Sequence, residues 1–189
     1  TNTDWNDILF RNALTQEYNM SIAGGGDKSD YYTSVGYNDE QGNVKGVGNT
    51  RYNITLKTNY QVNKLLKAGA SVYANERKQT TYLTDSNGFT NPVYYSRLAN
   101  PYFTPYDENG NYNYDTNVQG KEDSSLNFNI FEERANSNTK RRDRSMMAIL
   151  NAELRLTDYL KITSQFGLQE DSYSLSKYAN ENTYAMRKE

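Results

Sequence analysis

The chain has 189 residues, enough for one ordinary domain, and it carries a net charge of −2 with a pI of about 5.3. This near-neutral charge argues against nucleic-acid binding, and the absence of cysteine and histidine excludes disulfides, thiolate metal sites and Ser-His or Cys-His catalytic pairs. Mean hydropathy is low, at −0.97, but 13% of the residues are aromatic, so the chain is not composed like a disordered one.

The first segment, residues 1–13, opens directly on polar sequence and precedes the first repeating apolar pattern. It contains no signal peptide. Nowhere does the chain hold the run of about 18 apolar residues that a membrane-spanning helix needs.

Four strands are expected within residues 14–76, because apolar side chains recur there with a period of two instead of 3.6. The pattern is clearest over 51–60, RYNITLKTNY, and weaker over 18–22, 31–37 and 68–74. Several of these strands would have about ten residues, close to the ~9–11 that cross a bilayer at a tilt.

Two further strands are expected within residues 144–176, from the alternation at 148–156 and 160–168. A one-residue slip would move charged side chains onto the apolar face, so the facing of each strand is fixed. We expect one set of side chains to face lipid, namely Tyr52, Ile54, Leu56, Leu150, Leu154, Ile162 and Phe166. The opposite set should face the lumen of a barrel, namely Asn53, Lys57, Asn151, Arg155 and Gln165.

The connections between these strands alternate in length. GGGDKSD, QVNKLL and TDYL are short, 38–49 is longer, and 77–143 is the longest. Transmembrane barrels join their strands by short periplasmic turns and long external loops, whereas a soluble sandwich has no reason to sort its loops in this way. The sequence therefore favours a barrel with 77–143 as a long extracellular loop and 177–189 as the start of the next.

The long loop is where we expect contact with a ligand or partner, because its first half combines all three prolines with many tyrosines. Aromatic rings beside polar side chains suit sugar rings or peptide backbones. The alternative is that the rings pack the loop against itself. The candidate contact residues are Tyr94, Tyr95, Arg97, Tyr102 and Tyr106.

No catalytic residue, metal site or cofactor is expected. The series from Asp115 to Asp123 is spaced like a calcium-binding loop, but the position that needs a bidentate Glu is Leu126. Glu132 and Glu133 are adjacent and would point to opposite faces of a strand, so we interpret them as solvated charges.

Two other polar segments have simple interpretations. Asp107-Glu-Asn-Gly110 is a turn signature in which glycine supplies a positive φ. The basic run 140–142 with Arg144 would be an exposed charge run of the loop, or would meet anionic lipopolysaccharide or a partner.

As an ordered series, the motifs resemble those of the SusC/RagA-type TonB-dependent outer-membrane transporters, from the plug-barrel junction into the first barrel strands. The resemblance runs from residue 4 to about 170 and rests on DWNDILFR (4–11), QEYNMSIAGG (16–25), YYTSVGY (31–37), QGNVKG (41–46), VNKLLK (62–67), RLANPY (97–102) and YDENG (106–110). Each motif alone is only a strand or turn signal.

The resemblance implies a barrel of about 22 strands, plugged by an N-terminal domain. It also implies a SusD-like surface lipoprotein as partner, coupling to the TonB complex through the absent N-terminal part, and import of oligosaccharides or oligopeptides. Residues 1–13 would be the plug-to-barrel connector, and no binding residue carries over from the family by position.

We therefore expect an all-β, antiparallel transmembrane β-barrel segment of about six strands in the outer membrane, not an enzyme. Because an outer-membrane protein needs a signal peptide, this would be an internal piece of a longer precursor. Two alternatives stay open, a passive porin-like barrel and a soluble carbohydrate-binding or adhesin β-sandwich.

Overall fold

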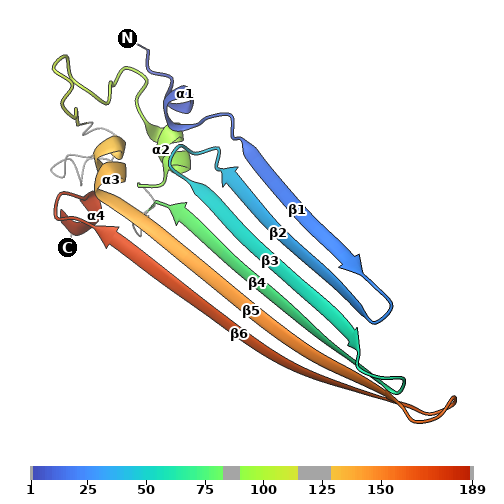
Figure 1. Ribbon diagram of the computed structural model, residues 1–189. Helices are drawn as coiled ribbons and strands as arrows, with labels where there is room; N and C mark the ends of the chain where they lie inside the picture. Colours follow the sequence, from blue (N-terminus) through green and yellow to red (C-terminus); the bar gives the residue numbers. More distant parts are fainter. Residues whose placement is uncertain (1, 83–89, 115–128, 188–189) are drawn as a thin grey trace.

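The computed structural model describes residues 2–82, 90–114 and 129–187. Its main element is one six-stranded antiparallel sheet in which each strand pairs with the next along the chain (Figure 1). The strands are β1 (Thr15–Gly25), β2 (Ser29–Gln41), β3 (Gly48–Gln61), β4 (Leu66–Thr81), β5 (Ser137–Arg155) and β6 (Lys161–Ala179). The six strands and the antiparallel sheet expected from the alternation are confirmed.

Several strands extend beyond the ranges that the alternation marks. β4 continues past residue 76 to Thr81, β5 begins at Ser137 instead of 144, and β6 continues past 176 to Ala179. Apart from Tyr178 and Ala179 at the end of β6, these ends are polar on both faces, so they carry no apolar period. They still pair, for example Lys140 with Thr80 and with Ser176, because the ladder is made by backbone groups.

The register divides the side chains as the alternation predicts. Directly opposite residues of antiparallel strands share a face, and Leu56 lies opposite Thr33 on β2 and Val72 on β4. The whole expected apolar set lies on this face, and the expected polar set lies on the other. Ile54 and Phe166 are 45% and 58% exposed, and the described residues form no second sheet. Within the described residues, the apolar face is thus not covered by a second layer of strands.

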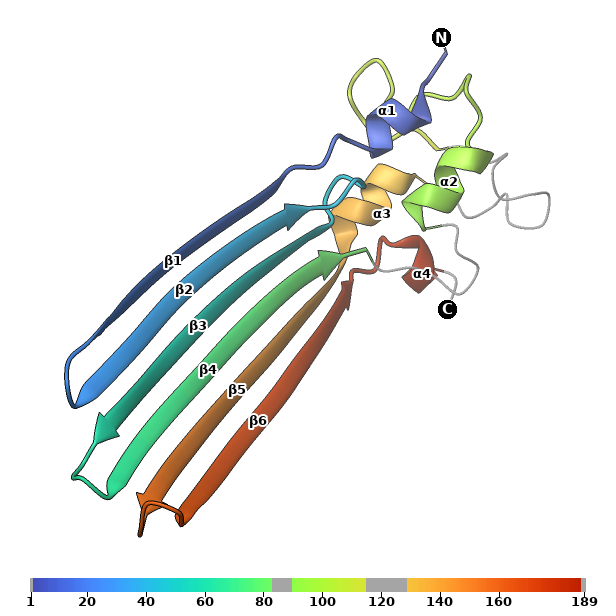
Figure 2. The same cartoon turned by 90° about the vertical axis from the view of Figure 1, so that its right-hand side faces the viewer.

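The described part of the chain has four short helices, which gather at one end of the curved sheet (Figures 1 and 2). They are α1 (Trp5–Leu9), α2 (Pro92–Leu98), α3 (Ile130–Asn136) and α4 (Tyr184–Arg187). The connecting residues 42–47, 82, 90–114 and 129–136 lie at this end, and the connections 26–28, 62–65 and 156–160 lie at the other. Within the described ranges, no helix is long and apolar enough to cross a membrane.

Two of the short connections are built in the same way. In one, the N–H groups of Val62 and Asn63 both donate to the carbonyl of Leu66, and in the other the N–H groups of Leu156 and Thr157 both donate to that of Leu160. The similarity of NKLLK and TDYLK in the sequence therefore reflects two equivalent hairpin turns.

The apolar core lies in the helical end of the molecule and not in the sheet. Its buried residues come from all four helices and are Trp5, Leu9, Tyr95, Ile130 and Tyr184. We call this end the rim layer and define it as residues 2–13, 42–47, 82, 90–114, 129–136 and 180–187.

Candidate functional site: the rim layer

Trp5 joins the start of the chain to the long connection. Asp4 caps α1 by accepting hydrogen bonds from the N–H groups of Asn6 and Asp7, which orients the helix. The Trp5 indole N–H donates to the carbonyl of Asn100 at 3.0 Å. Its ring stacks on Phe103 at 5.9 Å and meets the edge of Tyr95 at 5.2 Å. The motifs DWNDILFR and RLANPYF, far apart in the sequence, thus pack against each other.

The connection between β2 and β3 is bonded to the segment that follows α1. Phe10 forms a β-bridge with Val44, and the N–H of Arg11 donates to the carbonyl of Asn43 at 2.8 Å. Lys45 reaches back, since its N–H donates to the Leu9 carbonyl at 3.0 Å and its Nζ donates to the Asp7 carbonyl at 2.9 Å. Residues 2–13 are therefore held at the end of the sheet that carries the long connection.

Arg134 on α3 ties three segments together. Its guanidinium donates to the carbonyl of Lys45 and to the Tyr82 hydroxyl, and it stacks over the Tyr82 ring at 4.6 Å. Gly46 has a φ of +89° where the chain passes Tyr82, and a Cβ there would collide with the Tyr82 hydroxyl. Burial raises the pKa of Tyr82, and the positive charge of Arg134 opposes that rise.

Asn129 is the buried hydrogen-bonding centre of the layer. Its Oδ1 caps α3 by accepting from the N–H groups of Phe131 and Glu132. Its Nδ2 donates to the carbonyls of Pro105 and Asn113, at 2.7 and 2.6 Å. One side chain thus fixes the 105–113 hairpin to α3.

Glu133 corrects one interpretation of the sequence. We expected Glu132 and Glu133 to be solvated charges on opposite faces of a strand, but both lie on α3, and Glu133 is buried. Its Oε2 accepts from the N–H of Tyr184 at 2.6 Å, so the carboxylate links α3 to α4. A helix at this place had no apolar period long enough to reveal it.

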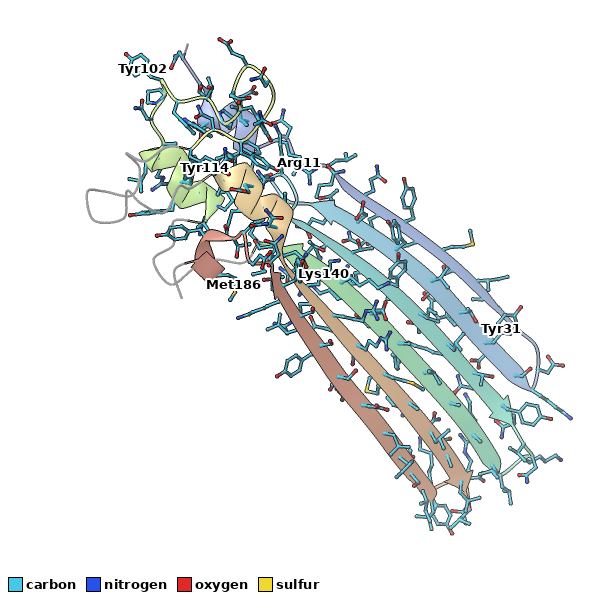
Figure 3. The ribbon with its side chains drawn as sticks, turned by 90° about the vertical axis from the view of Figure 1, so that its left-hand side faces the viewer. Arg11, Tyr31, Tyr102, Tyr114, Lys140 and Met186 are labelled. Carbon is cyan, nitrogen blue, oxygen red and sulfur yellow. The ribbon has the colours of Figure 1, made fainter. Side chains whose placement is uncertain are left out.

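The five candidate contact residues have different environments. Tyr95 is only 1% exposed and packs on Trp5, so its ring supports the layer. Tyr94, 46% exposed, and Arg97, also exposed, stand three residues apart on α2 and share a side of the helix. Tyr102 is 80% exposed and extends from the outer edge of the layer (Figure 3).

Tyr106 belongs to an aromatic cluster. Its ring lies 5.7 Å from that of Tyr112 and 5.6 Å from that of Phe131. Burial raises the pKa of Tyr106, with a smaller contribution from the neighbouring Tyr112. One side of the ring is thus packed, although the residue as a whole stays exposed.

The residues that build the layer were not identified from the sequence as a group. Trp5, Asn129, Glu133 and Arg134 carry no shared spacing, and the motifs around Trp5 and Asn100 do not by themselves indicate a contact. The calcium-like series from Asp115 to Asp123 lies outside the described residues. Among the residues that the structure describes, no group of acidic side chains could hold a metal ion.

Comparison with known proteins gives consistent results. No family model matches the chain. The TonB-dependent receptors P39 and P26 of Formosa agariphila are 38% identical over 66 residues and 30% identical over 113 residues. These matches cover 35% and 59% of this chain but only 6% and 11% of those receptors. The TonB-dependent receptor SusC of Bacteroides thetaiotaomicron is 46% identical over 44 residues, which are 23% of this chain and 4% of SusC.

The solved structures give the fold. A chain of the RagAB peptide importer in its closed-closed state superposes with a TM-score of 0.73 over 97% of this chain and 20% of its own length, at 20% identity. A second structure, of the RagAB peptide transporter, gives the same values. The chain therefore spans only a small part of the proteins it matches.

The relatives and the geometry agree on the nature of the sheet. TonB-dependent receptors are β-barrels of the outer membrane, and they are transporters and not enzymes. A single curved sheet with one exposed apolar face and one polar face is what part of such a barrel wall requires. In both sequence and fold, the chain therefore resembles a wall segment of the SusC/RagA-type TonB-dependent receptors.

Proposed function

We propose that this receptor imports an oligomeric nutrient, either an oligosaccharide or an oligopeptide, across the outer membrane. TonB would supply the force, and a SusD-like surface lipoprotein would bind at the external side. The observation that carries the proposal is a barrel wall with an elaborate folded layer at one end only, in a chain whose relatives are TonB-dependent receptors. RagAB is described as a peptide importer, which favours a system of this kind but leaves the substrate class open.

The rim layer should lie outside the cell. Barrels place short turns in the periplasm and long loops outside, and the three short turns lie at the end opposite the layer. Residues 2–13 are bonded into the layer, so the chain would enter β1 from the external side. A plug-to-barrel connector would have to reach β1 at this rim, and that interpretation of residues 1–13 stays a prediction.

Cysteine labelling tests this orientation in intact cells. Asn2 and Asp158 are both exposed, one in the rim layer and one in a short turn at the other end. A membrane-impermeant maleimide should label Asn2→Cys in the full receptor and should leave Asp158→Cys unlabelled until the cells are opened. The reverse pattern would contradict the proposed orientation.

The exposed side chains of the layer would contact the substrate or the lipoprotein. Tyr94, Arg97 and Tyr102 are exposed and offer large rings and a planar cation, and Tyr106 offers part of its ring. Such groups bind at a low cost in conformational entropy. Tyr95 would act indirectly, by supporting α2 against Trp5.

Growth on the cognate oligomer, at matched surface levels, measures these contacts. The double variant Tyr94→Ala/Arg97→Ala and the single variant Tyr102→Ala should each weaken binding of the substrate or the lipoprotein, by about 1–3 kcal/mol per buried contact. Val93→Ala is the matched control, because Val93 is exposed to a similar extent on the same helix. If both variants grow normally and the lipoprotein still co-purifies with them, these side chains contact neither the substrate nor the lipoprotein, and the layer has only a structural role.

Two further measurements separate the candidate functions. Uptake should be lost in a strain without TonB, whereas retained uptake would identify a passive porin-like barrel. Mass spectrometry of oligomers that compete for uptake should show whether peptides or glycans are the substrate class.

A further inference from the structure

A basic groove lies on the outer face of the sheet, near the rim layer. It has a volume of about 510 Å³, and its lining includes Lys78, Lys140, Arg142, Arg144, Ser174 and Ser176. The side chains come from β4, β5 and β6, three neighbouring strands. Lys140 marks its upper end in Figure 3.

The register places these cations on the apolar face and not on the lumen face. Lys78 pairs with Arg142, which pairs with Ser174, and this row belongs to the same face as Leu150 and Phe166. The basic run in the sequence is therefore divided by the pleat. Arg141 points to the lumen face, where it forms an ion pair with Asp143 at 2.8 Å.

The groove begins where the apolar belt of that face ends. On β1, β2 and β3 the belt is closed by Tyr18, Tyr37 and Tyr52, whose neighbouring ring centroids lie 6.3 and 5.2 Å apart. Such an aromatic row marks the level of the membrane interface in barrels. The same row continues across the sheet to Arg144, so the groove lies at the level of the outer-leaflet headgroups.

The groove carries a surplus of positive charge. Glu76 adjoins it and accepts from Lys78 at 2.9 Å and from Arg144 at 2.6 Å. Four cations against this one carboxylate leave a net charge of three positive units. Among the described residues, Lys140 and Arg142 have no ion-pair partner, and the other carboxylate on this face of β5 and β6, Glu170, lies lower, opposite Met146.

We infer that this groove binds the phosphate-bearing headgroup of an outer-leaflet glycolipid. Arg and Lys side chains form strong charge-assisted hydrogen bonds with phosphate oxygens, and the serine hydroxyls can bind the sugar or a further oxygen. The acyl chains would lie on the belt directly below, on Met146, Ala148 and Leu168. An acidic protein would match the charge but would not use the apolar side chains below the groove, so the lipid fits better.

The site is separate from the import path, because it lies on the other side of the barrel wall. The lipid would hold the base of the rim layer through β5, which leads directly out of α3. This inference depends on the barrel in its membrane and does not depend on which oligomer is imported.

The full-length receptor tests the site in nanodiscs of phosphatidylcholine that contain either phosphorylated or dephosphorylated lipid A. Native mass spectrometry then counts the glycolipid retained per receptor. The wild type should retain the phosphorylated form at least about tenfold better, as two charge-assisted contacts would give. Lys140→Gln/Arg142→Gln should remove this preference.

The control and the rescue keep the test decisive. Arg77→Gln/Lys177→Gln removes the same charge at a similar height on the lumen face and should retain the preference. Lys140→Arg/Arg142→Lys should retain it as well. Any one of four results would overturn the inference. Two concern the preference: equal retention of both lipid forms by the wild type, or an unchanged preference in the Gln double variant. The other two concern the ligand: displacement of the lipid by millimolar-range inorganic phosphate alone, or capture of an acidic protein in its place.

Discussion

The sheet and the rim layer differ in whether their apolar side chains are buried. The rim layer encloses its own core around Trp5, Tyr95 and Tyr184, although it is assembled from six separate stretches of chain. The sheet holds most of the regular structure but leaves one whole apolar face open. The layer can therefore maintain its shape from its own contacts, whereas the sheet depends on lipid and on neighbouring strands.

Separating this segment from its barrel should have the largest effect. β1 and β6 would leave two unpaired edges, and the apolar face would meet water, so the 189-residue chain should aggregate in detergent-free buffer. Size-exclusion chromatography with light scattering, followed by a thermal melt, measures this. A monodisperse monomer that melts cooperatively would show that the sheet does not need its surroundings.

Removing the central ring of the rim layer should have the next largest effect. Trp5→Ala leaves a cavity beside Tyr95 and Phe103 and removes the bond to the Asn100 carbonyl, at a cost of about 3–5 kcal/mol to the layer. Hydrogen exchange in the full receptor should accelerate across 90–114 and stay unchanged in β3 and β4. The exposed Tyr102→Ala serves as a control with little effect, and equal loosening of the sheet would mean that the two regions fold as one unit.

A charge on the outer face should destabilise the sheet, but only on that face. Leu150 lies midway along the apolar part of β5, so Leu150→Arg should cost about 2–4 kcal/mol in a membrane. The neighbouring Asn151→Arg points to the lumen face and should cost much less. Denaturant titration of the full receptor in lipid vesicles gives both values. Equal costs would mean that the two faces are not lipid and lumen.

The strands could be predicted from sequence because each one meets the same two environments along its apolar part. A period of two is enough to assign Leu56 and Lys57 to opposite faces, and the register bears this out. The prediction stopped at 76 and 144, where both faces become polar and the pattern disappears although the backbone ladder continues.

The rim layer could not be predicted in this way, because its contacts join residues far apart in the sequence, such as Trp5 with Asn100 and Lys45 with Arg134. Nothing in the sequence distinguishes Tyr94 from Tyr95, and only the packing of α2 against Trp5 buries one ring and exposes the other. The basic run illustrates the same limit, since its split between two faces depends on β5 extending to Ser137.

The smallest expected effect concerns pH and the turn at Asp107 in the rim layer. Hydrogen bonds from Asn111, first its backbone N–H and then its side chain, lower the pKa of Asp107, and the N–H groups of Asn109 and Gly110 add to this. Gly110 allows the turn by adopting a φ of +82°.

Because the pKa of Asp107 is lower in the folded state, the carboxylate stabilises the turn fully above its unfolded pKa of about 3.9. This contribution to stability is lost as the pH falls through the folded pKa. Hydrogen exchange of the 105–113 hairpin in the full receptor, corrected for the intrinsic rate, should therefore speed up slightly below about pH 4. Asp107→Asn keeps an acceptor oxygen without a titrating group and should remove this dependence. If the sheet responded over the same range and the hairpin did not, the turn would play no part in the acid response.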